Sequence, residues 1–150
     1  MSSMVKSLGL VVVIALVVAG CAGLKKKSDE EMIRETVQKV KLALESKNLD
    51  MLMETFAEDF SHDEAGDKAK AREMLQMGID MGYADDGECN IENIQIKIDK
   101  AKGEASVYPL DLSGAPGSVS VELIMGKREA VIGGKKQTAW LITTLNADGV

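Results

Sequence analysis

The hydrophobic and polar positions divide the chain into three regions with different patterns. Residues 8–20 form one apolar run that contains no charged side chain. Between residues 28 and 82, apolar residues recur every three or four positions, which indicates amphipathic helices. From residue 94 onward they alternate with polar residues, which indicates strands with one buried face. Helices followed by strands with short turns predict an α+β domain with an antiparallel sheet.

Three helices are predicted in the first half of this domain. The first follows Ser28, which can cap it together with Glu31 three residues on. A second, shorter helix follows residues 46–48 and is expected to end near Phe60. A third begins after Asp67, a plausible cap, and ends near Gly82. The segment between the second and third helices, residues 61–66, is predicted to be a polar connection.

The second half predicts strands that hide one apolar face on the helices. Alternation covers residues 94–99, 105–112 and 119–132, and a β-branched and aromatic segment, residues 140–145, is expected to be the last strand. Pro109 cannot donate to a strand ladder, so it marks an edge or a bulge. Gly133 and Gly134 indicate a hairpin turn.

The N-terminal apolar run has the layout of a secretory signal peptide. It follows Lys6, ends in small residues before Cys21 and is shorter than a membrane span requires. The segment Val18-Ala19-Gly20-Cys21 resembles the bacterial lipobox, in which the cysteine is acylated and becomes the mature N-terminus. An ordinary cleaved signal or a short anchor helix is the alternative.

The lipobox resemblance implies a domain organisation and a location. Residues 1–20 would be the signal peptide, residues 21–28 a lipidated tether, and residues 29–150 the folded domain. The protein would be lipid-anchored in the cell envelope. It would lie on the periplasmic face of the outer membrane if the host has one, because Ala22 is not the aspartate that retains such proteins in the inner membrane.

The charge and the cysteine and histidine content argue against several kinds of binding site. The formal net charge of the 150-residue chain is −6, and an acidic domain repels phosphate backbones, so no nucleic-acid binding is expected. If Cys21 carries lipid, Cys89 has no cysteine partner in this chain, and we expect it to be buried. The single histidine provides none of the ligand spacing of zinc sites, and we expect no metal and no cofactor.

Three short segments resemble the nuclear transport factor 2-like superfamily: Lys47-Asn48-Leu49-Asp50, Phe56-Ala57-Glu58-Asp59-Phe60 and Trp140-Leu141-Ile142. The resemblance implies a cystatin-like cone, in which three N-terminal helices pack in a strongly curved antiparallel sheet of about four to six strands. The superfamily contains enzymes, such as ketosteroid isomerase, and non-catalytic binding and association modules, so the fold does not give the function.

The resemblance also suggests candidate site residues. An ungapped comparison brings Glu64, or Asp63 with a one-residue slip, near the position of the general base in ketosteroid isomerase. His62 could act with these carboxylates as an acid/base site, although a solvated loop is the favoured interpretation. No tyrosine of an early helix is present to stabilise an oxyanion. Phe60, Tyr108 and Trp140 could surround a ligand pocket, and ordinary core packing is the alternative.

The sequence therefore predicts a membrane-anchored lipoprotein whose domain binds a small apolar ligand or a partner protein without catalysis. The alternative is a small lyase or isomerase that uses Glu64 or His62 at the mouth of the cone. A third possibility is a homodimer, because members of the superfamily often pair through the outer face of the sheet.

Overall fold

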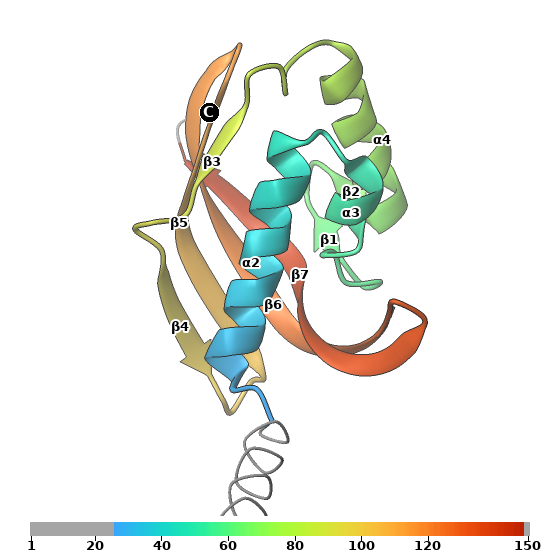
Figure 1. The fold of residues 1–150 in the computed structure, drawn as a ribbon, viewed down its shortest axis with the longest axis vertical. Helices are drawn as coiled ribbons and strands as arrows, with labels where there is room; N and C mark the ends of the chain where they lie inside the picture. The colour runs from blue at the N-terminus through green and yellow to red at the C-terminus, as the bar shows by residue number, and fades with distance from the viewer. Residues whose placement is uncertain (1–25, 149–150) are drawn as a thin grey trace, which may run out of the picture.

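The computed structural model describes residues 26–148, so the predicted signal peptide and Cys21 lie outside the described residues. Helices and strands follow one another in the predicted order, helices first. Figure 1 shows α2 lying lengthwise against a strongly curved sheet, with α3 and α4 beside it. The elements are α2 (Asp29–Glu45), α3 (Leu49–Met53), β1 (Ser61–His62), β2 (Gly66–Asp67), α4 (Lys68–Asp80), β3 (Glu88–Asn90), β4 (Gln95–Asp99), β5 (Glu104–Gly114), β6 (Gly117–Ile132) and β7 (Lys135–Asp148).

The predicted helix starts are confirmed by their caps. The Ser28 hydroxyl accepts a hydrogen bond from the backbone N–H of Glu31 at 3.2 Å, and the Asp67 carboxylate accepts one from the N–H of Lys70 at 2.9 Å. These side chains satisfy backbone donors that have no partner within the first turn of a helix. Asn48 caps α3 in the same way, through the N–H of Met51.

The end of the second helix differs from the prediction. Helix α3 ends at Met53 rather than near Phe60, because the backbone beyond it bonds to β7. The N–H of Ile142 donates to the Thr55 carbonyl at 2.8 Å, and the N–H of Ala57 donates to the Ile142 carbonyl at 2.9 Å. The polar connection predicted at residues 61–66 contains a small antiparallel hairpin, β1–β2.

The main sheet is antiparallel and follows the order β3–β5–β6–β7, with β4 pairing beside β3 on the same edge of β5. Of the two alternatives expected at Pro109, an edge or a bulge, the structure has an irregularity of the bulge kind, since the register between β5 and β6 shifts between Val107 and Leu110. Gly133 and Gly134 both have positive φ and close the hairpin between β6 and β7, as expected. Strand β3 was not predicted.

One core joins α2, α3 and the concave face of the sheet. The fully buried side chains include Ile33 and Val37 of α2, Val107 of β5, Met125 of β6 and Trp140 of β7. These elements bury their apolar faces against one another, so the described part of the chain contains a complete core and can fold on its own. Within this part, no helix is both long and apolar enough to cross a membrane.

Candidate ligand pocket

An apolar pocket of about 330 Å³ lies at one end of the fold, where α2 runs into α3. Its walls come from the C-terminal end of α2, from α3, from the second half of α4 and from the tip of the β5–β6 hairpin. This volume falls at the lower end of the range of small-molecule sites. The side chains that form most of its wall are aliphatic: Leu44, Leu52, Leu75, Ile79, Leu112 and Val119.

The local sequence explains why the pocket stays open. On α4, Leu75 and Ile79 pack against the core while Gly78 between them offers no side chain. A Cβ atom at Gly78 would lie 3.8 Å from the Tyr83 ring, so this position has room. At the opposite wall, a Cβ atom at Gly114 would lie 2.9 Å from the Tyr83 carbonyl oxygen, and only glycine permits this close approach.

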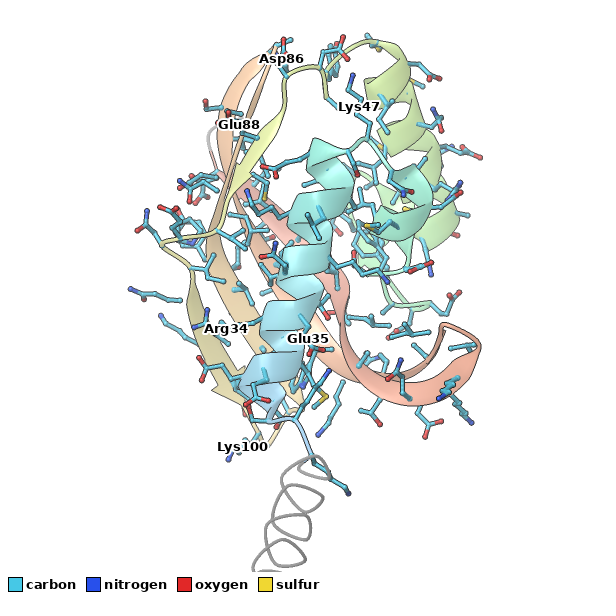
Figure 2. The ribbon with its side chains drawn as sticks, in the orientation of Figure 1. Arg34, Glu35, Lys47, Asp86, Glu88 and Lys100 are labelled. Atoms are coloured by element: carbon cyan, nitrogen blue, oxygen red, sulfur yellow. The ribbon has the colours of Figure 1, made fainter. Side chains whose placement is uncertain are left out.

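An ion pair connects the exposed edge of the pocket wall to the neighbouring loop. The Lys47 ammonium, at the corner between α2 and α3, pairs with the Asp85 carboxylate on the loop that precedes β3. Lys47 and Asp86 are the two described non-glycine residues with positive φ, at 55° and 53°. In Figure 2, Lys47 lies at the top of α2, below the loop that carries Asp86. Left-handed conformations of non-glycine residues often mark functional regions, and of these two residues Lys47 lines the pocket.

A second polar contact fixes β3 against α2 below the pocket. The Lys41 ammonium donates to the Cys89 carbonyl at 2.6 Å and to the Glu45 carboxylate at 2.8 Å, and Glu45 also accepts from the N–H of Cys89 at 3.1 Å. The hydrogen bond between Lys41 and Glu45 raises the pKa of Lys41 and lowers the pKa of Glu45. Burial raises the pKa of the Cys89 thiol to about 11, and its predicted burial is confirmed.

His62 and Glu64 lie away from this pocket. Both belong to the β1–β2 hairpin, which leads into the N-terminal end of α4, whereas the pocket contacts the C-terminal half of that helix. His62 Nδ1 accepts hydrogen bonds from the backbone N–H groups of Glu64 and Ala65, at 3.2 and 3.0 Å. The imidazole therefore supports the turn, and the exposed Glu64 side chain points to solvent rather than into an apolar site.

The three aromatic residues expected around a pocket do not line this one. Phe60 and Trp140 are 2% exposed and belong to the core, where the Trp140 Nε1–H donates to the Asp29 carboxylate at 3.2 Å. Tyr108 is half exposed, and its hydroxyl donates to the Asp148 carboxylate at 3.0 Å. That hydrogen bond raises the pKa of Tyr108.

Sequence reasoning did not single out Leu75, Gly78 and Ile79 of α4 or the residues of the β5–β6 hairpin as a site. Met74 of α4 also borders the pocket and is 48% exposed. Among residues 26–148, no group of three or more histidine, cysteine, aspartate or glutamate side chains is arranged to hold a metal ion.

The pocket lies at the C-terminal end of α2, which is remote from the described N-terminus. Helix α2 has 17 residues, which corresponds to a length of about 25 Å. Figure 1 shows the described N-terminus at one end of the molecule and α4, β3 and the β5–β6 tip at the other. The pocket thus lies at the end of the domain opposite to the described N-terminus.

Comparison with solved structures identifies the fold of this domain. A protein of unknown function from Nostoc punctiforme, described as having a cystatin-like fold, superposes with a TM-score of 0.57 at 18% identity and covers 82% of this chain and 93% of its own. This chain has a cystatin-like, nuclear transport factor 2-like fold. The predicted fold class is therefore confirmed: the domain is α+β, with a strongly curled antiparallel sheet around its helices.

Two further structures show the same fold with different names. An NTF2-like protein of unknown function from Pseudomonas putida has a TM-score of 0.53 at 12% identity and covers 77% of this chain and 82% of its own. A candidate dehydratase of the NTF2-like family from Streptomyces avermitilis has a TM-score of 0.57 at 11% identity, with 79% and 94% covered. No family model matches the chain, and no curated protein matches its sequence. At these identities the comparisons establish the fold alone.

Proposed function

We propose that this protein is a lipid-anchored envelope protein whose domain binds a small apolar molecule in the pocket between α2, α3, α4 and the β5–β6 hairpin. The observation that carries this proposal is the aliphatic wall of the pocket, which Gly78 leaves open. Burying an apolar ligand there would remove its surface from water, at about 25 cal/mol for each Å² buried.

Binding without turnover fits the chemistry of the wall. General acid/base catalysis needs a titratable group within hydrogen-bonding reach of the reacting atom and a donor for the charge that develops. The single histidine of the sequence lies outside the pocket and holds a turn through Nδ1. The alternative of a lyase or isomerase built on Glu64 or His62 therefore has less support than a binding function.

The position of the pocket also suits an anchored protein. If Cys21 carries lipid, residues 21–28 connect the membrane to the N-terminal end of α2, and the pocket lies about 25 Å away along that helix. A ligand would then enter from the aqueous side of the envelope, where a partner protein could also deliver or receive it.

The test is a titration of residues 22–150 with the neutral apolar fluorophore 1-aminoanthracene. Saturable binding at one site is expected, and Gly78→Leu should weaken it about tenfold or more by filling the pocket. Gly78→Ala is the matched control, because its Cβ atom fits at 3.8 Å from Tyr83. Equal affinity in the native protein and in Gly78→Leu would overturn the proposal. Circular dichroism checks that each variant is folded.

A further inference from the structure

Two charged residues contribute to the wall of the pocket, Lys47 and Glu88. Side chains of a strand alternate between its faces, and Glu88 precedes Cys89, whose side chain is buried in the core. The Glu88 carboxylate therefore lies on the outer face of the sheet, where it borders a separate polar hollow together with Asp111 and Ser120. Figure 2 shows Glu88 at the outer side of β3. The ammonium of Lys47 is thus the one charged group that the described wall presents at the mouth.

Two further polar side chains of the wall, Asn48 and Ser113, are uncharged and exposed, and the Asn48 oxygen already accepts from the N–H of Met51. Deeper than the mouth the wall consists of residues such as Leu52, Leu75 and Ile79. No side-chain nitrogen or oxygen that is buried among the described residues lacks a hydrogen-bond partner. A ligand with polar groups at both ends would lose hydrogen bonds to water on entry and regain none inside. The pocket therefore suits a molecule with one hydrocarbon tail and one polar head that stays at the mouth.

We propose that the ligand is a single-tailed amphiphile with a carboxylate head, and that this head replaces Asp85 as the partner of Lys47. The inference rests on the proposed function, since it names the ligand class of the same pocket. The charge is complementary, because Lys47 offers a cation whose present partner is itself a carboxylate. Replacing one carboxylate by another conserves the ion pair while the tail fills the apolar space.

Breaking the Lys47–Asp85 pair costs little free energy because both side chains are at the surface. The Lys47 and Asp85 side chains are 42% and 57% exposed, and ion pairs at this exposure contribute little to stability. Asp85 lies on a loop between Gly82, with φ of 81°, and Gly87, and it would be released into water. Binding of the ligand would therefore not leave a buried carboxylate without a partner.

The experiment measures displacement of 1-aminoanthracene from residues 22–150 by decanoate, 1-decanol and decyltrimethylammonium, each below the concentration at which it aggregates. At low salt, decanoate should bind about two- to fivefold more tightly than decanol, and the ammonium compound most weakly. Lys47→Gln should remove the preference for decanoate and leave decanol unchanged. Lys97→Gln, an exposed lysine of β4, is the charge-matched control that should retain it.

A second variant separates this inference from a structural effect of Lys47. Asp85→Asn should tighten decanoate about two- to fivefold, because it removes the competitor for Lys47, and should leave decanol unchanged. Asp86→Asn changes the net charge equally but keeps the Lys47–Asp85 pair, so it is expected to have a smaller effect. If decanol binds as tightly as decanoate in the native protein and in both variants, the proposal of a carboxylate head is wrong. The proposal that the pocket binds an apolar ligand would still stand. Failure of all three compounds to displace the bound fluorophore would overturn the single-tailed amphiphile as the ligand, whereas absence of fluorophore binding would overturn the proposed function.

Discussion

Arg128 donates two parallel hydrogen bonds to Asp59, from Nε to Oδ1 at 3.0 Å and from Nη2 to Oδ2 at 2.9 Å. The two residues are 69 positions apart in the sequence, and the pair joins the turn that follows α3 to strand β6. Bidentate pairs of this kind fix geometry as well as charge. Asp59 belongs to the aromatic and acidic segment on which the family resemblance rests, so the contact gives that acidic residue a structural role.

Asp59→Asn is expected to lower the free energy of unfolding by at most about 1 kcal/mol at neutral pH, since the Asp59 side chain is 61% exposed. The Arg128 hydrogen bonds lower the pKa of Asp59 below its usual 3.8. A carboxylate with a depressed folded-state pKa stabilises the fold above its unfolded pKa and loses this contribution as the pH falls through the folded value. The difference between native protein and variant should therefore shrink progressively as the pH falls below 3.8.

Urea denaturation at neutral and acidic pH measures this effect. Asp63→Asn is the control, because Asp63 is exposed in the same region and the described ion pairs do not include it. An Asp59→Asn protein that loses as much stability at the lowest pH as at pH 7 would show that the loss comes from packing rather than from the charged pair.

Cys89 is expected to be unreactive in the folded protein. Its thiol is buried and has a pKa of about 11, so at pH 8 about one thiol in a thousand is ionised. In residues 22–150 it is the only cysteine, because the sequence has two and Cys21 is the other. Labelling by a thiol-specific disulfide reagent should be roughly a hundredfold or more faster in urea than in native buffer. Equal rates in the two conditions would mean that the β3 edge is open.

Cys21→Ser tests the predicted anchor. Acylation at this position needs a thiol, so the full chain expressed in its host should incorporate labelled palmitate and fractionate with membranes, whereas Cys21→Ser should do neither. Cys89→Ser is the matched control, expected to keep the label. A native protein that incorporates no label would contradict the lipobox interpretation and favour the ordinary cleaved signal or the anchor helix.

Local sequence signals predicted most of the fold. The caps Ser28 and Asp67, the bulge at Pro109 and the glycine pair of the last hairpin each act through their immediate neighbours, and each lies where it was expected. These features depend on backbone donors and dihedral angles within a few residues, so the sequence alone determines them.

Features that depend on distant partners were missed. Strand β3 pairs with β5 but has only three residues, and one of them, Cys89, is buried. A strand this short shows no recognisable alternation of apolar and polar residues. Phe56 and Phe60 continue the helical spacing of α3, but the backbone leaves the helix to bond Ile142 of β7. Tertiary hydrogen bonds outweigh the local pattern at both places.

The pocket could not be predicted because its wall combines segments that are far apart in sequence. The end of α2, the second half of α4 and the β5–β6 tip meet only in the folded chain. The exposure of Tyr108, in contrast, could have been predicted. Val107 is buried, and because side chains alternate along a strand, its neighbour Tyr108 lies on the outer face. The family resemblance suggested Phe60 and Trp140 as pocket residues, but both are packed in the core.

The measurement that tests the central claim most directly is a two-dimensional amide NMR spectrum of residues 22–150, recorded with and without decanol. The account predicts that the largest shift changes fall on the amides of Gly78, Gly87, Gly114 and Gly117, which belong to the pocket wall. Changes centred on His62 and Glu64 would instead favour the β1–β2 hairpin as the site. A spectrum that decanol leaves unchanged would contradict a ligand-binding function for this pocket.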